Sequence, residues 1–219
     1  MQINVLTLFP DFFTSPLKVS LLGKAIDNEI LQVNLINFRN YTENRHGKVD
    51  DAPYGGGSGM IIQVEPIANS LQKLETPGHV ILLTPRAPLM KQADIVRLSA
   101  FENLTLICGH YEGFDERIAE ELADESLCIG EFILSGGEPA ALCLIDALAR
   151  LQPGFMSNQN SIVQESFSKS EYIEFPQYTR PREFQGKRVP DVLLSGNHEA
   201  IERWREERSI EDYKRFRKL

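Results

Sequence analysis

Three loops carry the residue types best suited to holding a ligand, each begins where a predicted strand ends, and two of the three contain glycine. Residues 84–85, 109–113 and 129–137 follow the apolar stretches His79–Leu83, Leu104–Cys108 and Leu127–Ile129. In open α/β sheets, ligands bind beyond the carboxyl ends of the strands, where glycine lets backbone N–H and C=O groups come close to them. The three loops together therefore predict one pocket. The alternative is that their glycines only make tight turns.

A fourth glycine-rich segment, residues 50–60, has the sequence Asp-Asp-Ala-Pro-Tyr-Gly-Gly-Gly-Ser-Gly-Met. It is not a P-loop, because no Lys-Ser/Thr pair follows the last glycine, and no strand leads into it as a dinucleotide fingerprint requires. Its aspartates are suited to a metal ion or to base N–H groups, and Arg45, His46 and Lys48 just upstream are suited to phosphates. The alternative is a flexible loop without a role.

Apolar patterning predicts the elements that position these loops. Strands are expected at Ile3–Phe9 and Leu31–Phe38 besides the three named above, and helices at Val64–Leu74, Lys91–Ser99, Asp115–Leu122 and Glu138–Leu151. Strands that alternate with helices indicate an α/β domain with a mainly parallel sheet. Residues 152–175 are rich in turn formers and predict a linker or flexible loop, followed by a helix at Glu199–Arg208 capped by Asn197 and a final helix at 209–218.

The composition is that of an ordinary globular protein, with 42% hydrophobic and 25% charged residues among 219. No apolar run is long enough for a membrane span and the N-terminus shows no secretory signal, so we expect a cytoplasmic protein. Cys108, Cys128 and Cys143 lie in apolar segments and are expected to be reduced core residues. The histidines are scattered, which argues against structural zinc.

Charge is distributed unevenly along the chain. Residues 176–219 contain 11 Lys and Arg against 8 Asp and Glu, whereas residues 1–175 contain 12 against 23. The net charge of −8 alone argues against a nucleic-acid partner, but this asymmetry suggests an acidic catalytic body with a basic appendage. The alternative is a solvated helix end.

Five motifs, in order along nearly the whole chain, carry a resemblance to one family. They are Arg45-His46 with Asp50–Met60, Cys108–Arg117, Ile129–Glu138, Pro176–Pro181 and Val192–His198. Together they resemble the bacterial tRNA (guanine-N1-)-methyltransferases, the TrmD family. The resemblance implies an enzyme that methylates N1 of the guanosine immediately 3′ of the anticodon in tRNA, using S-adenosylmethionine, with assistance from magnesium whose ligands the sequence does not indicate.

The resemblance also implies the architecture: a SPOUT-type parallel sheet with a deep trefoil knot, plus a small, mainly helical C-terminal domain. Knots are rare enough that only the resemblance supports one here. It divides the chain into a catalytic domain at 1–156, a linker at 157–175 and a tRNA-binding domain at 176–219. It further implies a homodimer with a shared active site and no membrane association.

Matching positions give the binding residues that the resemblance implies. Those for S-adenosylmethionine are Leu82, Leu83, Thr84, Pro85, Gly109, Tyr111, Glu112, Gly113, Ile129, Gly130, Glu131, Phe132, Ile133, Leu134, Gly136 and Gly137. Those for tRNA are Arg45, His46, Asp50, Tyr54, Gly59, Tyr178, Arg180, Ser195, Asn197 and His198, with phosphate attraction added by Arg203, Arg205 and Lys214. Arg86 and Ala87 stand where members often have Gln-Gly, and Phe132 replaces a frequent tyrosine.

Guanine N1 carries a proton at neutral pH, so methylation needs a base near N1 and positive charge near O6. The resemblance implies that Glu165, just before Ser166-Phe167, is this base, although the family has an aspartate there. It implies that Arg150 stabilises charge at O6. The alternatives are an ordinary exposed glutamate and an arginine that complements the dipole of its helix.

The sequence argues against three rival functions. A nucleotide-dependent kinase or dehydrogenase needs a Walker lysine or a Gly-x-Gly-x-x-Gly after the first strand, and both are absent. A non-enzymatic RNA-binding protein is opposed by the intact glycine loops and by the carboxylate at 165. A SPOUT methyltransferase that acts on ribosomal RNA is opposed by the long motif at 50–60.

Overall fold

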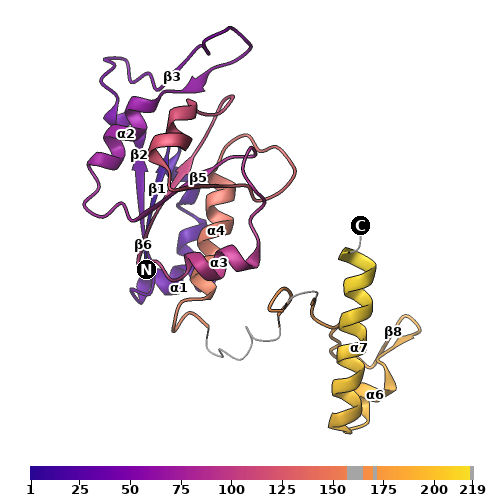
Figure 1. Ribbon diagram of the computed structural model, residues 1–219. Helices are drawn as coiled ribbons and strands as arrows, with labels where there is room; N and C mark the ends of the chain where they lie inside the picture. Colours follow the sequence, from indigo (N-terminus) through magenta and orange to yellow (C-terminus); the bar gives the residue numbers. More distant parts are fainter. Residues whose placement is uncertain (157–164, 170–171, 218–219) are drawn as a thin grey trace. The chain divides into compact units, whose positions relative to one another are not determined.

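The computed structural model describes residues 1–156, 165–169 and 172–217. The chain forms two compact units, Met1–Met156 and Ser157–Leu219, and each is described by itself below (Figure 1).

A five-stranded parallel sheet forms the centre of the first unit. Its strands are β1 (Gln2–Thr7), β2 (Gln32–Asn37), β5 (His79–Leu83), β6 (Asn103–Cys108) and β7 (Glu125–Leu127), in the order β2-β1-β6-β5-β7. The central strands are buried along almost their whole length, as expected when helices cover both faces of a parallel sheet, and only β5 is almost continuously apolar. The predicted parallel α/β sheet is thus confirmed.

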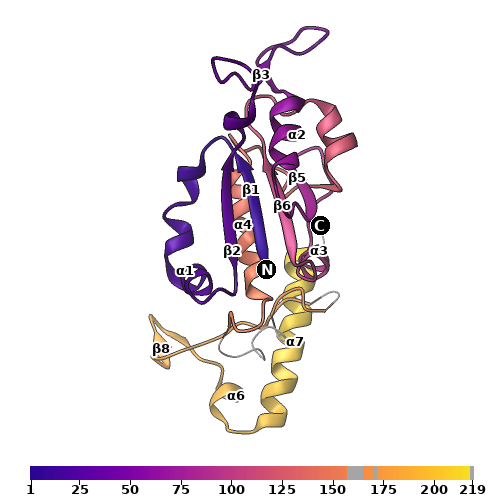
Figure 2. The same cartoon turned by 90° about the vertical axis from the view of Figure 1, so that its left-hand side faces the viewer.

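Helices cover both faces of this sheet (Figure 2). The core on one face joins alternate strand residues to α1 (Ser20–Asp27), α3 (Gln92–Leu98) and α4 (Glu138–Arg150). The core on the other face includes α2 (Val64–Gln72), η3 (Phe38–Tyr41) and the π-helical turn η4 (Ile118–Leu122). Two short 3-10 turns, η1 (Pro10–Phe13) and η2 (Pro16–Lys18), precede α1.

Helix α4 is held by an apolar stripe in which Ala141, Leu144, Ile145 and Leu148 are fully buried. These residues recur at helical spacing and therefore line one face. Cys143 lies on the exposed side of the same helix, so the expectation of three core cysteines is wrong for this residue, while Cys108 and Cys128 are buried.

The strand order explains why three distant loops meet. β6, β5 and β7 are adjacent and parallel, so their carboxyl ends lie at the same edge of the sheet and the chain leaves each of them there. A small antiparallel pair, β3 (Asp50–Asp51) with β4 (Ile61–Ile62), brackets the glycine-rich segment between them. In both views its loop extends beyond one end of the sheet.

The second unit contains the hairpin β8 (Glu183–Phe184) with β9 (Lys187–Arg188), the short helix α6 (Asp191–Leu194) and the long helix α7 (His198–Arg217). Where the sequence predicted two final helices, α7 is continuous. Ser209, at the predicted break, is buried and donates to the carbonyl of Ile173 at 2.5 Å, which holds the middle of the helix in place. The predicted cap is confirmed, because Asn197 Oδ1 accepts from the Ala200 N–H at 3.1 Å.

Within the described ranges, no helix combines the length and the apolar character that crossing a bilayer requires.

Candidate functional site

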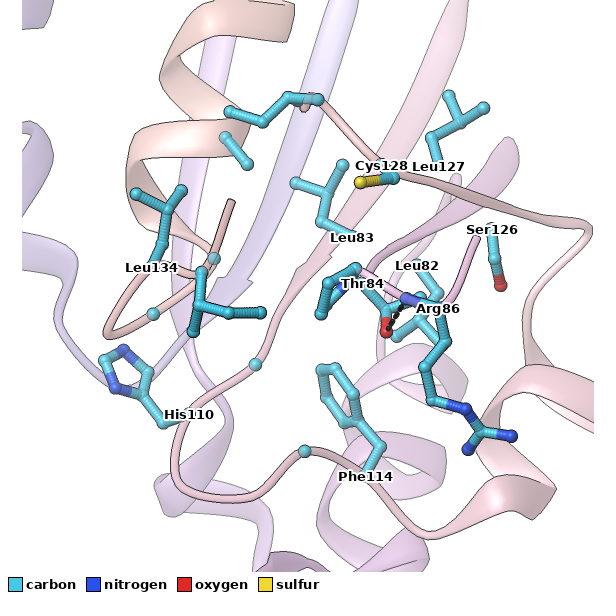
Figure 3. Close-up of a pocket in the computed structure, with 18 of the residues that line it drawn as sticks. Leu82, Leu83, Thr84, Arg86, His110, Phe114, Ser126, Leu127, Cys128 and Leu134 are labelled. Atoms are coloured by element: carbon cyan, nitrogen blue, oxygen red, sulfur yellow. Dashed lines mark hydrogen bonds between the residues drawn. The ribbon is translucent and has the colours of Figure 1, made fainter. Parts of the chain in front are cut away.

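A cavity of about 410 Å³ opens at the carboxyl ends of β5, β6 and β7 (Figure 3). Its walls come from the loops that follow these three strands and from the first turns of α4. Apolar side chains such as Leu82, Leu83 and Leu134 line it together with backbone groups of the loops. A concave, mostly apolar cavity with a few polar groups is the usual form of a small-molecule site.

The structure brings together around this cavity all the residues that the resemblance assigned to S-adenosylmethionine, except Glu131, which does not line it. The lining also includes residues that sequence reasoning did not assign: Arg86, His110, Phe114, Asp115, Glu116, Ala119, Ser126, Leu127, Cys128, Ser135 and Ala140. Several of these belong to the same motifs as assigned residues. Their membership in those motifs was the signal available for finding them.

The three loops are tied to one another directly beside the cavity. The Thr84 N–H donates to the carbonyl of Leu127 at 3.0 Å, and the Gly137 N–H donates to the carbonyl of Gly109 at 2.8 Å. A Cβ on Gly137 would lie 2.7 Å from the Cα of Cys108, closer than real Cβ atoms come. Gly137 is therefore required because another part of the backbone passes close to it. This is a second reason for glycine here, besides the expected approach of a ligand.

A buried carboxylate lies behind these loops. Glu138, the first residue of α4, accepts from the hydroxyl of Thr7 at 2.5 Å and lies 2.7 Å from Nε2 of His110. Burial raises the pKa of the neighbouring Cys108 thiol, and the charge of Glu138 raises this pKa further. Cys108 therefore stays a neutral thiol and supplies no nucleophile.

Charged pairs occupy another part of the cavity wall. Arg86 and Glu116 form an exposed ion pair with 2.5 Å between Nη1 and Oε2, and Figure 3 shows Arg86 across the cavity from His110. Asp115 accepts two hydrogen bonds from the Arg117 side chain, at 2.8 and 2.6 Å, which lower the pKa of this carboxyl. This contact keeps the Asp115 carboxylate ionised at neutral pH.

The glycine-rich segment at 55–59 is fixed to one of the cavity loops. The Glu112 N–H donates to the carbonyl of Met60 at 3.0 Å, and the Ile62 N–H donates to that of Gly113 at 2.9 Å. A side chain on Gly59, which has a φ of +78°, would collide with Glu112. This segment thus contacts the cavity loop, while Tyr54 at its tip is fully exposed.

The residues assigned to tRNA fall into two sets, one in each unit. Arg45, His46, Asp50, Tyr54 and Gly59 lie along the loops around β3 of the first unit. Tyr178, Arg180, Ser195, Asn197 and His198 are exposed in the second unit. Two of the latter also have structural hydrogen bonds: Asn197 caps α7, and the Ser195 hydroxyl donates to the carbonyl of Val192 at 2.8 Å.

The two residues assigned to catalysis also lie in different units. Arg150 is the last residue of α4, where a cation complements the helix dipole, and it is half-buried. Glu165 is half-buried in the second unit, and its carbonyl accepts from the Ser168 N–H at 3.1 Å. Of the segment predicted as a linker, residues 157–164 and 170–171 lie outside the described residues.

Comparison with known proteins places this chain in a family. The family model described as "tRNA (Guanine-1)-methyltransferase TrmD" matches residues 1–218. The tRNA (guanine-N(1)-)-methyltransferase of Lactobacillus johnsonii is 50% identical over 210 residues, which cover 96% of this chain and 86% of that protein. The enzyme of the same name from Staphylococcus carnosus is 49% identical over 212 residues, with the same coverage of both chains. The chain belongs to the tRNA (guanine-1)-methyltransferase family, TrmD.

Proposed function

We propose that this chain transfers a methyl group from S-adenosylmethionine to N1 of the guanosine immediately 3′ of the anticodon in tRNA. The observation that carries the proposal is the cavity at the ends of β5, β6 and β7, found in a chain of this family. Its relatives at about half identity over nearly their whole length have the printed name of this activity.

The cavity fits S-adenosylmethionine in size and in chemistry. Its volume of about 410 Å³ lies within the usual range of roughly 300–1,000 Å³ for small-molecule sites. Apolar side chains and backbone groups suit an adenine and a ribose, and the carboxylates of Glu112 and Glu116 suit a ligand with positive charges. When bound, S-adenosylmethionine supplies a methyl group already activated on a sulfonium, so the chain needs no nucleophile of its own.

The protein must then deprotonate guanine N1 and stabilise the charge that grows at O6. We propose Glu165 as the base that accepts the N1 proton and Arg150 as the cation that stabilises O6. Glutamate keeps the carboxylate chemistry of the family's aspartate with one more methylene. The loops that hold the methyl donor contribute orientation, which accounts for much of the remaining rate enhancement.

The proposal includes a homodimer with a shared active site and a trefoil knot in the first unit. Membership in this family supports the knot. The large exposed side chains Phe9, Phe12, Ile133 and Leu134 support a partner on the first unit. No group of three or more metal-ligand side chains gathers among the described residues, so no step is assigned to magnesium.

Both sets of tRNA-assigned residues are proposed to contact substrate. In the second unit, Arg203 and Arg205 pair with Glu199 and Glu202 on the same helix, at 3.0 and 2.5 Å. The Arg203 pair is exposed and therefore weak, so it exchanges readily for a phosphate. Arg205 is half-buried, with its guanidinium 4.7 Å from the centre of the Phe175 ring, so it is more firmly held. A cytoplasmic location accords with a tRNA substrate and with reduced cysteines.

Calorimetric titration of the full chain with S-adenosylmethionine tests the proposal at its first step. The expected result is saturable heat with one site for each chain. An RNA-binding protein without activity would give no heat with S-adenosylmethionine while still binding tRNA, and that outcome would contradict the proposal.

A further inference from the structure

Glu138 is a buried carboxylate at the start of α4, and glutamate side chains are rarely buried this fully in proteins. Its exposed fraction is 2%, and it does not line the cavity, although Gly137 and Ala140 on either side of it do. Burying a charged group is costly unless partners replace its water. An apolar residue at this position would avoid the free-energy cost of burial. We therefore expect the Glu138 carboxylate to have a specific role beside the cavity.

The partners of Glu138 form a chain of hydrogen bonds with a defined direction. The Phe9 N–H donates to Thr7 Oγ1 at 2.9 Å, and the Thr7 hydroxyl donates to Glu138 Oε1 at 2.5 Å. His110 Nε2 lies 2.7 Å from the other carboxylate oxygen. We assign the proton of this contact to His110 Nε2, because a carboxylate only accepts hydrogen bonds when it is ionised. The position of Glu138 at the start of α4 adds the favourable field of the helix dipole.

These contacts join three chain segments that are far apart in sequence: the end of β1, the loop after β6 and the start of α4. His110 is the member that lines the cavity, and its backbone forms a bridge with Gly136. The Phe9 ring packs edge-on against the imidazole, with 4.7 Å between ring centroids. The imidazole is thus fixed on two sides, and its loop is held against the segment 136–137.

We propose that Glu138 and His110 are a positioning pair that holds the cavity loops in the conformation that binds S-adenosylmethionine. This inference rests on the proposed function and deepens it. The pair does not touch the reacting atoms; it orders the walls before the ligand arrives, so that binding does not have to order them. Removal of the carboxylate should therefore weaken cofactor affinity more than it changes the methyl-transfer step.

The test compares Glu138→Ala, Glu138→Gln and Thr7→Val by calorimetry with S-adenosylmethionine, together with kcat and both KM values. Glu138→Ala removes the acceptor of both the Thr7 and the His110 contacts. It should raise the cofactor Kd at least about tenfold, the effect of losing even one charge-assisted hydrogen bond. Glu138→Gln should recover part of this loss, because an amide still accepts from Thr7 and donates to His110. The KM for tRNA should change much less than the KM for the cofactor.

The protein contains a matched control. Glu125 is also a poorly exposed carboxylate bonded to a histidine, with 2.6 Å between Oε1 and Nε2 of His79, but it begins β7 and does not itself line the cavity. Glu125→Gln should lower stability without changing the cofactor Kd. A Kd that rises equally in Glu125→Gln and Glu138→Gln would overturn the inference by showing a general loss of stability.

A spectroscopic signature completes the test. In the wild-type protein, ¹⁵N NMR of the His110 ring should show the proton on Nε2. In Glu138→Gln, the amide donates to Nε2, so the proton of the neutral ring should move to Nδ1.

If the wild-type chain binds S-adenosylmethionine and the Glu138 and Thr7 variants bind it equally well, this inference is wrong while the proposed function stands. If the wild-type chain does not bind it, the proposed function fails as well.

Discussion

At the scale of single residues, the cavity loops owe their shape to contacts that a sequence pattern does not reveal. A side chain on Gly136 would collide with His110 and Glu138, and one on Gly59 with Glu112. The sequence indicated glycine for a ligand's approach, whereas the structure adds the close packing of one loop on another. The motifs were found from residue types alone, but the partners of Glu138 depend on which strands are neighbours.

The role of Glu165 is the most consequential residue-scale prediction. Glu165→Gln keeps the size and polarity of the side chain but removes its ability to accept the N1 proton. We expect methyl transfer to fall about 10²–10⁴-fold, the usual contribution of a general base. Single-turnover kinetics with saturating tRNA and cofactor measure this step. Glu165→Asp, which restores the family's residue, is the control and should retain activity.

Normal single-turnover rates in Glu165→Gln would contradict this assignment. A reduced single-turnover rate in Glu165→Gln, together with an unchanged cofactor Kd, would show that the loss lies in proton transfer and not in cofactor binding.

The ion pair of Arg86 and Glu116 predicts a small coupling in cofactor binding. Both side chains line the cavity and are largely exposed, so their interaction should be worth about 0.2–1 kcal/mol. In a double-mutant cycle with Arg86→Ala and Glu116→Ala, the double variant should lose less affinity for S-adenosylmethionine than the two single losses added together. The coupling should shrink at high salt. Additive losses at low salt would show that the two residues act separately.

At the scale of elements, prediction succeeded where the pattern was local and strong. The strand His79–Leu83 is confirmed with its bounds, and the helix at 138–151 is confirmed within one residue. Helix α1 was missed, because it follows two 3-10 turns and begins at Ser20 with a positive φ, without a capping signal. The break predicted within α7 was wrong, because Ser209 is held by a distant carbonyl that no local pattern shows.

Helix α7 provides a direct measurement of capping. Asn197→Ala removes the acceptor for the Ala200 N–H and should destabilise the second unit by about 1 kcal/mol. Trp204, the only tryptophan of the chain, lies on α7 near Tyr178, so its fluorescence during denaturant unfolding reports on this unit. Asn197→Asp keeps the acceptor and should be nearly neutral. Equal destabilisation in both variants would show that the amide matters for another reason.

The contact between α3 and β7 predicts a dependence of stability on pH. Two hydrogen bonds from Arg97, at 2.9 and 2.7 Å, are the main cause that lowers the pKa of Glu125, and His79 adds to it. A lowered pKa stabilises the folded state above the unfolded value of about 4.3, and this stabilisation is lost as pH falls through the folded pKa.

Glu125→Gln should therefore lower the free energy of unfolding by about 1–3 kcal/mol at neutral pH. The difference from wild type should disappear in acid. Thermal unfolding followed by far-ultraviolet circular dichroism at several pH values measures it. A difference that stays constant down to pH values below the folded pKa would mean that the charge of Glu125 contributes nothing.

At the scale of the whole molecule, negative and positive charge are concentrated in different parts of the chain. The first 175 residues are strongly acidic and contain the cavity, whereas residues 176–219 have a net positive charge. Affinity for tRNA carried by phosphate contacts should therefore fall steeply with salt, and affinity for S-adenosylmethionine should fall much less. The net charge of −8 averages over both parts, so the positive charge of residues 176–219 is seen only when the two parts are counted separately.

One pair of substrates tests most directly whether this chain methylates one guanosine of tRNA. Two unmodified transcripts of the same tRNA differ only in the base immediately 3′ of the anticodon, guanosine in one and adenosine in the other. Each is incubated with the full chain and S-adenosylmethionine carrying a labelled methyl group, then digested to nucleosides. We expect labelled 1-methylguanosine from the first transcript and no label in the second. Equal labelling of both transcripts, or no labelling of either by a chain that binds the cofactor, would contradict this expectation.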